Sequence, residues 1–421
     1  MGAFVIRGCE IYLGGAFVPA ELEVRGGVVT ALGGGIVPGE GASVYNFKNC
    51  IVVPGLADVH VHLREPGFSY KETVASGTRA AARSGYAALC AMPNLSPVPE
   101  DAATLAQELD IIRRDAVIDV LPYGAITRGQ KGEQLADMSA MSPYVCGFSD
   151  DGRGVQSREL MRAAMLEAKR LGRPIAAHCE DNSLLRGGYI HDGEYAKAHG
   201  HRGICSESEW GPIARDIELL RETGCAYHVC HISTAESAAL IRSAKREGLD
   251  ITCETAPHYL LLSDSDLQED GRFKMNPPLR SERDRLALIE ALRDGTIDIL
   301  ATDHAPHSAE EKSRGLAGSA FGITGLETAF PLLWTGLVEP GIITRERLVE
   351  LMSTAPARRF GIESGIEPGG PATFAVFETE TTYRIDPERF ASKGRATPFA
   401  GREVRGRCVL NVVRGREVWR A

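Results

Sequence analysis

The stretch IVVPGLADVHVHLREPG, residues 51–67, decides the fold that we expect for this chain. It begins as an apolar run, typical of a strand that is buried on both faces. It then reaches two histidines, His60 and His62, before Gly and Pro mark a turn. Side chains two residues apart in a strand lie on the same face. The pattern therefore predicts a buried strand that delivers two imidazoles to one place.

The same kind of apolar strand recurs along the chain, separated by helical stretches. KETVASGTRAAARSG (71–85) and RELMRAAMLEAKRLG (158–172) are two such stretches. Strand–helix alternation predicts βαβ units and a parallel sheet, and eight units indicate an α/β fold of the (β/α)8 TIM-type barrel class. The predicted strands are 51–60, 87–93, 117–125, 145–149, 174–178, 226–231, 251–257 and 297–303.

The two ends of the chain have a different character from the middle. Residues 1–55 and 366–421 are short alternating runs rich in Val, Ile and Gly, which predict antiparallel strands joined by tight turns. We expect both ends to form one small β-sandwich beside a barrel of residues 56–365. The polar insertion 186–203 is predicted to be a surface loop.

Composition excludes several classes of function. The 421 residues carry a formal charge of −9, without the basic footprint of a nucleic-acid or anionic-membrane binder. No stretch has the length of apolar sequence that spans a bilayer, and the N-terminus does not resemble a signal peptide. The ten cysteines include no CxxC pair, which favours reduced thiols in a cytoplasmic protein.

Polar groups follow seven of the eight predicted strands, at the end of a barrel where active sites lie. An isolated His-x-His pair is a weak signal and is more often two hydrogen-bonded barrel histidines than a metal site. His178, His231 and Asp303 recur at the ends of later strands, however, and this recurrence favours a metal site. The strand ends read DVHVH (58–62), MPN (92–94), FSDDG (148–152), AAHCED (176–181), HVCHIS (228–233), TAPHY (255–259) and ATDHAPH (301–307).

The number of these groups predicts two ions, because a single catalytic zinc needs only three protein ligands. A carboxylate could bridge the ions, and the fourth strand offers both Asp150 and Asp151 for that position. Two metals would activate water near neutral pH and polarise a carbonyl. Asp303 could then carry the proton from the attacking water to the leaving group, which makes it the catalytic candidate.

A second set of residues at this rim suits an anionic substrate. Arg64 offers a planar fork that matches a carboxylate, and Asn94 and Asn276 can donate amide hydrogens beside it. The Gly- and Ser-rich stretch 307–327 has the length of a functional loop. It supplies His307, which could donate to substrate or hold the loop, and Phe321 and Gly322, which could make backbone contacts. His258 fits either a structural imidazole or a ligand, and the structural role is favoured.

Together these motifs resemble the amidohydrolase superfamily and, within it, the bacterial type I dihydroorotases. The resemblance rests on DVHVHLREPG, AMPN, FSDDG, AHCED, HVCHIS, MNPPLR and ATDHAPH, in that order over about residues 50–365. It implies a distorted barrel with a small β-sandwich. It also implies zinc-dependent interconversion of dihydroorotate and N-carbamoyl-aspartate, in de novo pyrimidine biosynthesis.

The resemblance assigns residues as well. It implies that His60, His62 and Asp303 hold one zinc ion and that His178 and His231 hold the other. Many superfamily members bridge the ions with a carbamylated lysine, but YVCGFSDDG (144–152) contains none. This chain is similar to the branch with an aspartate there, at Asp151. The implied carboxylate-binding residues are Arg64, Asn94 and Asn276, with His307 as a further substrate contact.

Two alternatives stay open beside this interpretation. Hydantoinases and allantoinases share the superfamily chemistry, but they generally carry the bridging lysine. Some dihydroorotase-like chains have instead lost their metal ligands and serve as partners of aspartate carbamoyltransferase, whereas this chain keeps every expected ligand. The resemblance further suggests a homo-oligomer and a complex with that carbamoyltransferase, neither of which can be read from the sequence.

Overall fold

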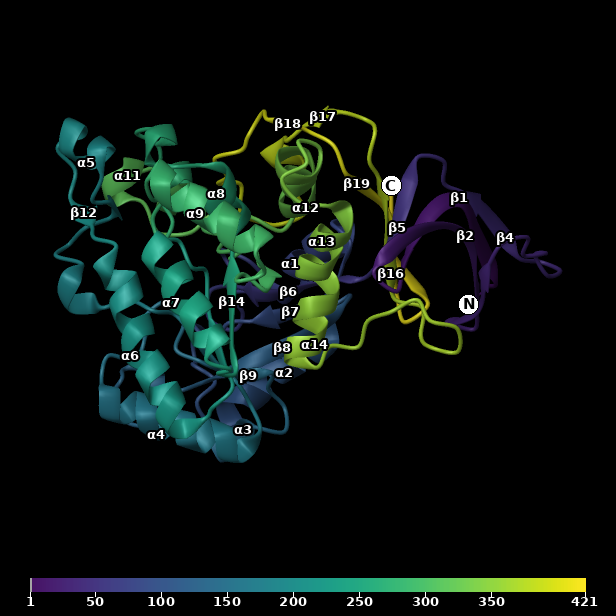
Figure 1. The fold of residues 1–421 in the computed structure, drawn as a ribbon. Helices are drawn as coiled ribbons and strands as arrows, with labels where there is room; N and C mark the ends of the chain where they lie inside the picture. The colour runs from purple at the N-terminus through teal and green to yellow at the C-terminus, as the bar shows by residue number, and fades with distance from the viewer. Residues whose placement is uncertain (1) are drawn as a thin grey trace.

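The structure, a computed structural model, describes residues 2–421 and contains two large sheets. Figure 1 shows a barrel surrounded by helices and, to its right, a separate sheet in which purple N-terminal strands meet yellow C-terminal strands. Both marked chain ends lie at this second sheet, which we call the end sheet. The predicted α/β class, a barrel with a separate β-unit from the two ends, is confirmed.

The barrel consists of eight parallel strands in the order β15-β14-β13-β10-β9-β8-β7-β6. Its first and last strands approach each other through a parallel bridge between Val61 and His304, so the barrel is nearly closed. Parallel strands place all of their carboxyl ends on one rim. The strands are β6 Leu56–Val61, β7 Tyr86–Ala91, β8 Asp119–Ala125, β9 Gly147–Ser149, β10 Ile175–Ala177, β13 Tyr227–Val229, β14 Ile251–Thr255 and β15 Ile299–Leu300.

The predicted strand 51–60 is wrong as a single element. Cys50–Pro54 forms β5 of the end sheet, whereas β6 of the barrel starts only at Leu56. Gly55 lies at the switch between the sheets, where a Cβ atom would collide with the side chain of Ala87. The apolar run is continuous because β5 and β6 are both buried, and so hydrophobicity alone does not reveal the break.

The end sheet is one hydrogen-bonded sheet with the path β20-β19-β16-β5-β1-β2-β3, and β4 pairs with β1. Its two extremes share one apolar core, because Val29 of β3 and Val412 of β19 belong to the same cluster. The expected sandwich is therefore a single sheet folded over on itself, and its boundaries at 55 and 366 stay a prediction. The strands are β1 Phe4–Leu13, β2 Ala16–Arg25, β3 Val28–Gly33, β4 Ser43–Asn46, β5 Cys50–Pro54, β16 Phe374–Glu378, β19 Arg407–Val413 and β20 Arg416–Arg420.

Strand β5 joins the two units through its alternating side chains. Ile51 and Val53 belong to the large core shared with the barrel, whereas Cys50 and Val52 belong to the core of the end sheet. This period of two is what a strand buried on both faces requires. The end sheet is thus packed against the barrel directly beside the strand that carries His60.

The helices cover the outside of the barrel where the sequence predicts them. Thr73 caps α1 with a capping box, and Gly172, at a φ of 64°, ends α4. No helix of residues 2–421 is both long and apolar enough to cross a membrane. These helices include α1 Val74–Arg83, α2 Ala102–Asp115, α3 Met138–Met141, α4 Arg158–Leu171, α6 Glu207–Thr223, α7 Ala235–Arg246, α9 Glu282–Arg293, α12 Ala329–Leu333, α13 Arg345–Val349 and α14 Ala355–Phe360.

Two segments expected as loops contain regular structure. Within the insertion 186–203, α5 (Glu194–His199) follows β11 (Ile190–His191), which pairs in parallel with β12 (Gly203–Ile204). The segment 307–327 contains two single-turn helices. The remaining short elements are α8 Pro257–Leu261, α10 Ala309–Lys312, α11 Gly315–Gly318, β17 Tyr383–Arg384, β18 Glu403–Val404, the 3-10 turns at 128–130, 182–184, 264–266, 271–273 and 387–389, and π turns at 334–338 and 350–354.

Candidate metal centre and substrate pocket

The predicted site residues gather around one cavity at the carboxyl-terminal rim of the barrel. The cavity has a volume of about 210 Å³. All twelve predicted residues except His60 line it, and His60 lies directly beneath, fully buried. The lining residues are His62, Arg64, Asn94, Asp151, Gly152, His178, His231, Asn276, Asp303, Ala305, His307, Phe321 and Gly322.

His60 is oriented by a carboxylate behind it. Its Nδ1 atom lies 2.6 Å from Oε1 of Glu254, a buried residue of β14. Because a carboxylate only accepts hydrogen bonds, Nδ1 carries a hydrogen, and Nε2 is the nitrogen left to bind a metal. That Nε2 atom faces the cavity side, 3.3 Å from Asp151 Oδ1 and 3.6 Å from Asp303 Oδ1.

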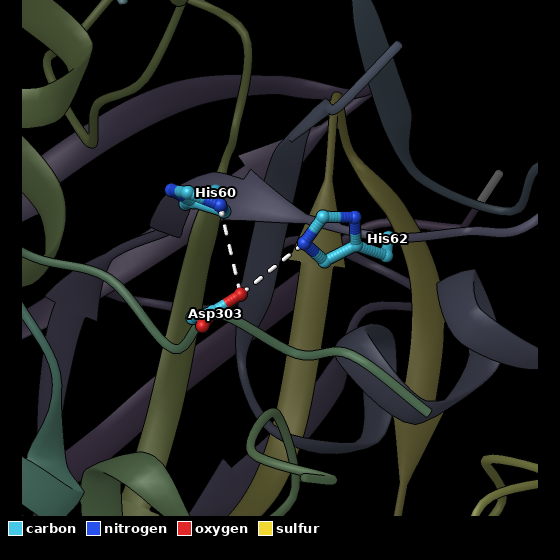
Figure 2. Close-up of side chains that lie close together, drawn as sticks. All are labelled: His60, His62 and Asp303. Atoms are coloured by element: carbon cyan, nitrogen blue, oxygen red, sulfur yellow. Dashed lines mark hydrogen bonds and ion pairs between the residues drawn. The ribbon is translucent and has the colours of Figure 1, made fainter. Parts of the chain in front are cut away.

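His62 is oriented in the same way by an amide oxygen. Its Nδ1 atom lies 2.8 Å from Oδ1 of Asn94, and its Nε2 atom lies 3.2 Å from Oδ1 of Asp303. Figure 2 shows both imidazoles directed at this one carboxylate. With both Nδ1 atoms donating elsewhere, the two Nε2 atoms converge on one oxygen of the Asp303 carboxylate. Such an arrangement is suited to a metal cation.

The atoms of this centre also lack other partners. His60 Nε2 and Asp151 Oδ1 are buried and form no hydrogen bond within residues 2–421. The ligand atoms of His60, His62 and Asp303 lie within 4.8 Å of one another, and so do those of His60, Asp151 and His231. Unpartnered buried groups are costly unless a ligand satisfies them. The donor set, imidazoles with carboxylates, fits a zinc-like ion.

A second group of ligand atoms lies on the other side of Asp151. Asp151 Oδ1 is 3.4 Å from His178 Nδ1 and 3.5 Å from His231 Nε2, and these two nitrogens are 2.9 Å apart. Asp151 therefore contacts histidines of both groups. Asp150 is directed away from the site, because its side chain accepts hydrogen bonds from the Thr127 hydroxyl and amide.

The electrostatics of the centre favour positive charge. Burial raises the pKa of Asp151, but His60 and its other histidine partners outweigh burial and hold it well below its ordinary value. For His60 burial lowers the pKa, yet Asp151 and Glu254 raise it well above the usual value. Burial also lowers the pKa of His178, but Asp151 and Glu180 outweigh burial and raise it to about 10. The buried carboxylates thus stay ionised and attract a cation.

The backbone is strained where ligands enter the site. Arg64, His231 and Asp303 have positive φ angles of 63°, 34° and 48°, a conformation that non-glycine residues rarely adopt. Strain of this kind persists where the surroundings over-determine it, and it clusters at functional sites. At His231 the next residues are held by buried Glu209, which accepts the amide hydrogens of Ser233 and Thr234 at 2.9 and 3.1 Å.

Arg64 is available for an anion. It is buried, and no carboxylate oxygen of residues 2–421 lies within 4.0 Å of its guanidinium. Its Nε atom donates to the Pro306 carbonyl at 3.3 Å. Burial lowers the pKa of Arg64 to about 10, so the side chain stays charged at neutral pH. A buried cation without a counter-ion beside a metal centre is suited to bind a substrate carboxylate.

His307 holds the rim loop. Lys71 Nζ lies 3.3 Å from its Nδ1 and Arg64 Nη2 lies 3.3 Å from its Nε2, but the shortest contact of Nε2 is to a carbonyl oxygen, which only accepts, so Nε2 carries the hydrogen. Nε2 donates to the Phe321 carbonyl at 2.7 Å. Burial, Arg64 and Lys71 lower the pKa of His307 to about 3, which keeps the ring neutral. Of the two roles left open for His307, the structure contains the loop contact.

Gly322 and Asn276 occupy constrained positions in the lining. Gly322 has a φ of 128°, and a Cβ atom there would lie 2.6 Å from the Ala305 carbonyl oxygen. Asn276 donates from Nδ2 to Glu180 Oε1 at 2.8 Å, and the other oxygen of Glu180 lies 3.5 Å from His178 Nε2. Glu180 therefore links the substrate side of the cavity to the metal side.

Sequence reasoning missed Glu254 and Glu180. A charged residue inside the buried strand ITCET (251–255) was the available signal for Glu254, because glutamate is rarely buried without a partner. Its second oxygen lies 3.0 Å from Nε2 of buried His228, which extends the chain behind His60. His258 is buried outside the cavity, and its Nε2 has no hydrogen-bond partner within residues 2–421, so it does not bond the backbone through that atom.

Comparisons with known proteins agree with this geometry. A family model described as Dihydro-orotase-like matches residues 49–237. The chain is 47% identical to the dihydroorotase of Bacillus caldolyticus, over 100% of this chain and 99% of that protein. It is also 47% identical to the dihydroorotase of Geobacillus kaustophilus, with the same coverage.

Solved structures with the same fold belong to related hydrolases. An L-hydantoinase from Arthrobacter aurescens superposes with a TM-score of 0.88 at 25% identity, covering 100% of this chain and 96% of that one. A dihydropyrimidinase from Brevibacillus agri superposes with a TM-score of 0.86 at 22% identity, covering 99% and 95%. The second likeness concerns the fold alone.

Proposed function

Because this chain belongs to the dihydroorotase family, we propose that it catalyses the reversible hydrolysis of the cyclic amide of dihydroorotate to N-carbamoyl-aspartate, a step of de novo pyrimidine biosynthesis. The observation that carries this conclusion is 47% identity to dihydroorotases over the whole chain. The chain is a metal-dependent cyclic amidohydrolase, and its small-molecule substrate fits the small cavity at the rim.

We propose two zinc ions per subunit. His60, His62 and Asp303 would hold one ion, His178 and His231 the other, and Asp151 would contact both. The support is the convergence of imidazole nitrogens and buried carboxylate oxygens. Bound zinc lowers the pKa of water and polarises a carbonyl group. The behaviour of this chain's own residues accounts for the rest of the reaction.

Asp303 is the proposed proton carrier. Burial raises its pKa, but His62 and His60 outweigh burial, so the pKa lies below the ordinary value and the carboxylate is ionised at neutral pH. An ionised carboxylate can take the proton of the attacking water and release it to the departing ring nitrogen. The positive φ of Asp303 directs this side chain into the cavity from the end of β15.

The substrate carboxylate would be held on the opposite side of the cavity. Arg64 supplies the charge, and Asn94 has its amide hydrogens available because its oxygen accepts from His62. Asn276 would contribute once its hydrogen bond to Glu180 is exchanged for one to substrate. The Phe321 N–H donates to no acceptor within residues 2–421, and so it is available to a ring oxygen. Fixed contacts of this kind orient the scissile carbonyl.

The test is a substrate panel assayed after zinc is restored to the apo-protein. We expect rapid turnover of dihydroorotate and slow turnover of hydantoin, allantoin and dihydrouracil, which lack the ring carboxylate that Arg64 would bind. Preferred hydrolysis of hydantoin or allantoin would favour the hydantoinase alternative. No turnover, with zinc near zero in freshly purified protein, would favour a non-catalytic partner of aspartate carbamoyltransferase.

Assembly and location are further proposals. We infer a cytoplasmic homo-oligomer, and we infer a complex with aspartate carbamoyltransferase from the family resemblance. Sedimentation of the purified chain, alone and with that carbamoyltransferase, would test both assemblies.

A further inference from the structure

Lys312, at the end of α10, is a buried cation that the proposed reaction does not use. Only 6% of the residue is exposed, and no carboxylate oxygen of residues 2–421 lies within 4.0 Å of its ammonium group. Lysine is rarely buried without a charged partner, because removing an ammonium group from water is costly. Its position therefore requires compensation from neutral groups.

That compensation comes from three carbonyl groups. Nζ donates to the carbonyl oxygens of Lys274 at 2.9 Å, Ala320 at 2.7 Å and Gly322 at 2.7 Å. An ammonium group has three hydrogens, so three acceptors satisfy it completely. Burial lowers the pKa of Lys312 to about 7, with neighbouring Lys274 acting in the same direction.

The three carbonyls belong to two different loops of the rim. Lys274 lies two residues before Asn276, on the loop after β14, whereas Ala320 and Gly322 flank Phe321 on the loop after β15. The Lys274 carbonyl also accepts the Gly322 N–H at 3.1 Å. Lys312 thus connects the segment that carries Asn276 with the segment that carries Phe321.

We propose that Lys312 is a positioning residue for substrate: its three hydrogen bonds fix the Phe321 backbone and the Asn276 loop at the separation that the substrate ring requires. The carbonyls of 320 and 322 are held by Lys312 and that of 321 by His307. The three carbonyls are thereby all engaged, while the Phe321 N–H stays available for a ligand. The inference rests on the proposed function, because Phe321 and Asn276 are substrate contacts only in that reaction.

The experiment compares Lys312→Met and Lys312→Arg with wild type, at a temperature well below the unfolding transition and with zinc restored. Methionine keeps the length and apolar stem but removes the donors. Arginine keeps the charge, but its planar fork cannot reach three carbonyls arranged around one nitrogen. We expect the KM for dihydroorotate to rise at least tenfold in Lys312→Met and twofold to tenfold in Lys312→Arg. The kcat and the zinc content should stay within threefold, because Lys312 contacts neither Asp303 nor a metal-binding residue, and loosening the two loops weakens binding of substrate and transition state alike.

Lys169→Met is the control for losing a lysine–carbonyl hydrogen bond, since exposed Lys169 also donates to a backbone carbonyl, that of Thr223, but far from the cavity lining. Its KM should equal that of wild type. Folded, zinc-loaded Lys312 variants whose KM lies within twofold of wild type would overturn the positioning role. If Lys312→Met does not fold, the KM of Lys312→Arg decides by the same limit. Absence of dihydroorotate turnover in wild type would instead refute the proposed function.

Discussion

Replacing Glu254 with glutamine should weaken zinc binding without altering the shape of the centre. Glu254 does not itself line the cavity, and it acts through His60, whose Nδ1 lies 2.6 Å from its carboxylate, and through the His231 backbone N–H, which it accepts at 3.3 Å. Burial raises the pKa of Glu254, but His60 and His228 outweigh burial and hold it below the ordinary value, so the group is a buried anion. The anion fixes the ring orientation and makes the facing nitrogen more basic.

The magnitude follows from the contact that is lost. A glutamine oxygen can still accept from Nδ1, so the geometry survives while the charge disappears. Removing an outer partner of a metal-bound histidine lowers metal affinity by roughly 10–100-fold. That corresponds to about 1.4–2.8 kcal/mol, which agrees with the roughly 1.5–3 kcal/mol expected for a hydrogen bond to a charged group.

The assay is a zinc titration of apo-protein in competition with a chromogenic chelator. Glu108→Gln is the control for replacing a buried glutamate away from the site, because Glu108 is equally buried in α2, contacts none of the metal-centre residues and has a pKa that burial raises well above the ordinary value. We expect the zinc dissociation constant to rise at least tenfold in Glu254→Gln and to stay unchanged in Glu108→Gln. Equal zinc affinity of wild type and Glu254→Gln, with both folded, would show that the carboxylate does not tune His60.

Four further outcomes are expected. Asp303→Asn should lower kcat by about 10²–10⁴-fold while the other ligands retain metal, and near-normal turnover in a steady-state assay would remove Asp303 as proton carrier. Arg64→Ala should raise KM for dihydroorotate by roughly 10–100-fold, because a charged hydrogen bond is lost. An unchanged preference for dihydroorotate over dihydrouracil would contradict the proposal that Arg64 binds the substrate carboxylate. Gly322→Ala should raise KM, because its Cβ would lie 2.6 Å from the Ala305 carbonyl oxygen and would displace the cavity lining. Wild-type kinetics in this variant would show that the lining at Gly322 has room for a methyl group. Burial and Arg280 lower the pKa of His191 from 6.5 to about 4, so the unfolded state binds more protons and stability falls as pH drops from about 6.5 to 4. In urea titrations with chelator present, the free energy of unfolding should fall over that pH range by up to about 3 kcal/mol less in His191→Gln than in wild type. An identical fall in both proteins would show that His191 does not cause the loss of stability in acid.

The strand ends of the barrel could be predicted because chemistry and position coincide there. His60, His178, His231 and Asp303 each follow an apolar run, and a parallel barrel brings the ends of such runs to one rim. The prediction needed no knowledge of side-chain contacts, because topology alone gathers these groups. Their roles in binding and catalysis stay predictions.

Other features depend on contacts between distant segments, which a linear pattern does not contain. The break at Gly55 separates two buried strands of similar hydrophobicity, so the sequence pattern predicts a single strand over residues 51–60. The three carbonyls around Lys312 and the positive φ of Asp303 are properties of the folded backbone. Glu254 was detectable in principle, since it is a charge within a buried strand, but only the structure shows that it meets His60.

Because the end sheet pairs strands from both ends of the chain, the order of synthesis affects β6, the strand that carries His60. Strand β5, directly before β6, hydrogen-bonds to β16, which the ribosome produces only after the entire barrel. During translation one edge of β5 therefore stays unpaired until β16 has been synthesised. Only then is the strand pairing complete that fixes β5 and, through it, the start of the strand that carries His60. A chain cut short after the barrel contains all of the rim residues, but one edge of β5, the strand directly before β6, is left unpaired.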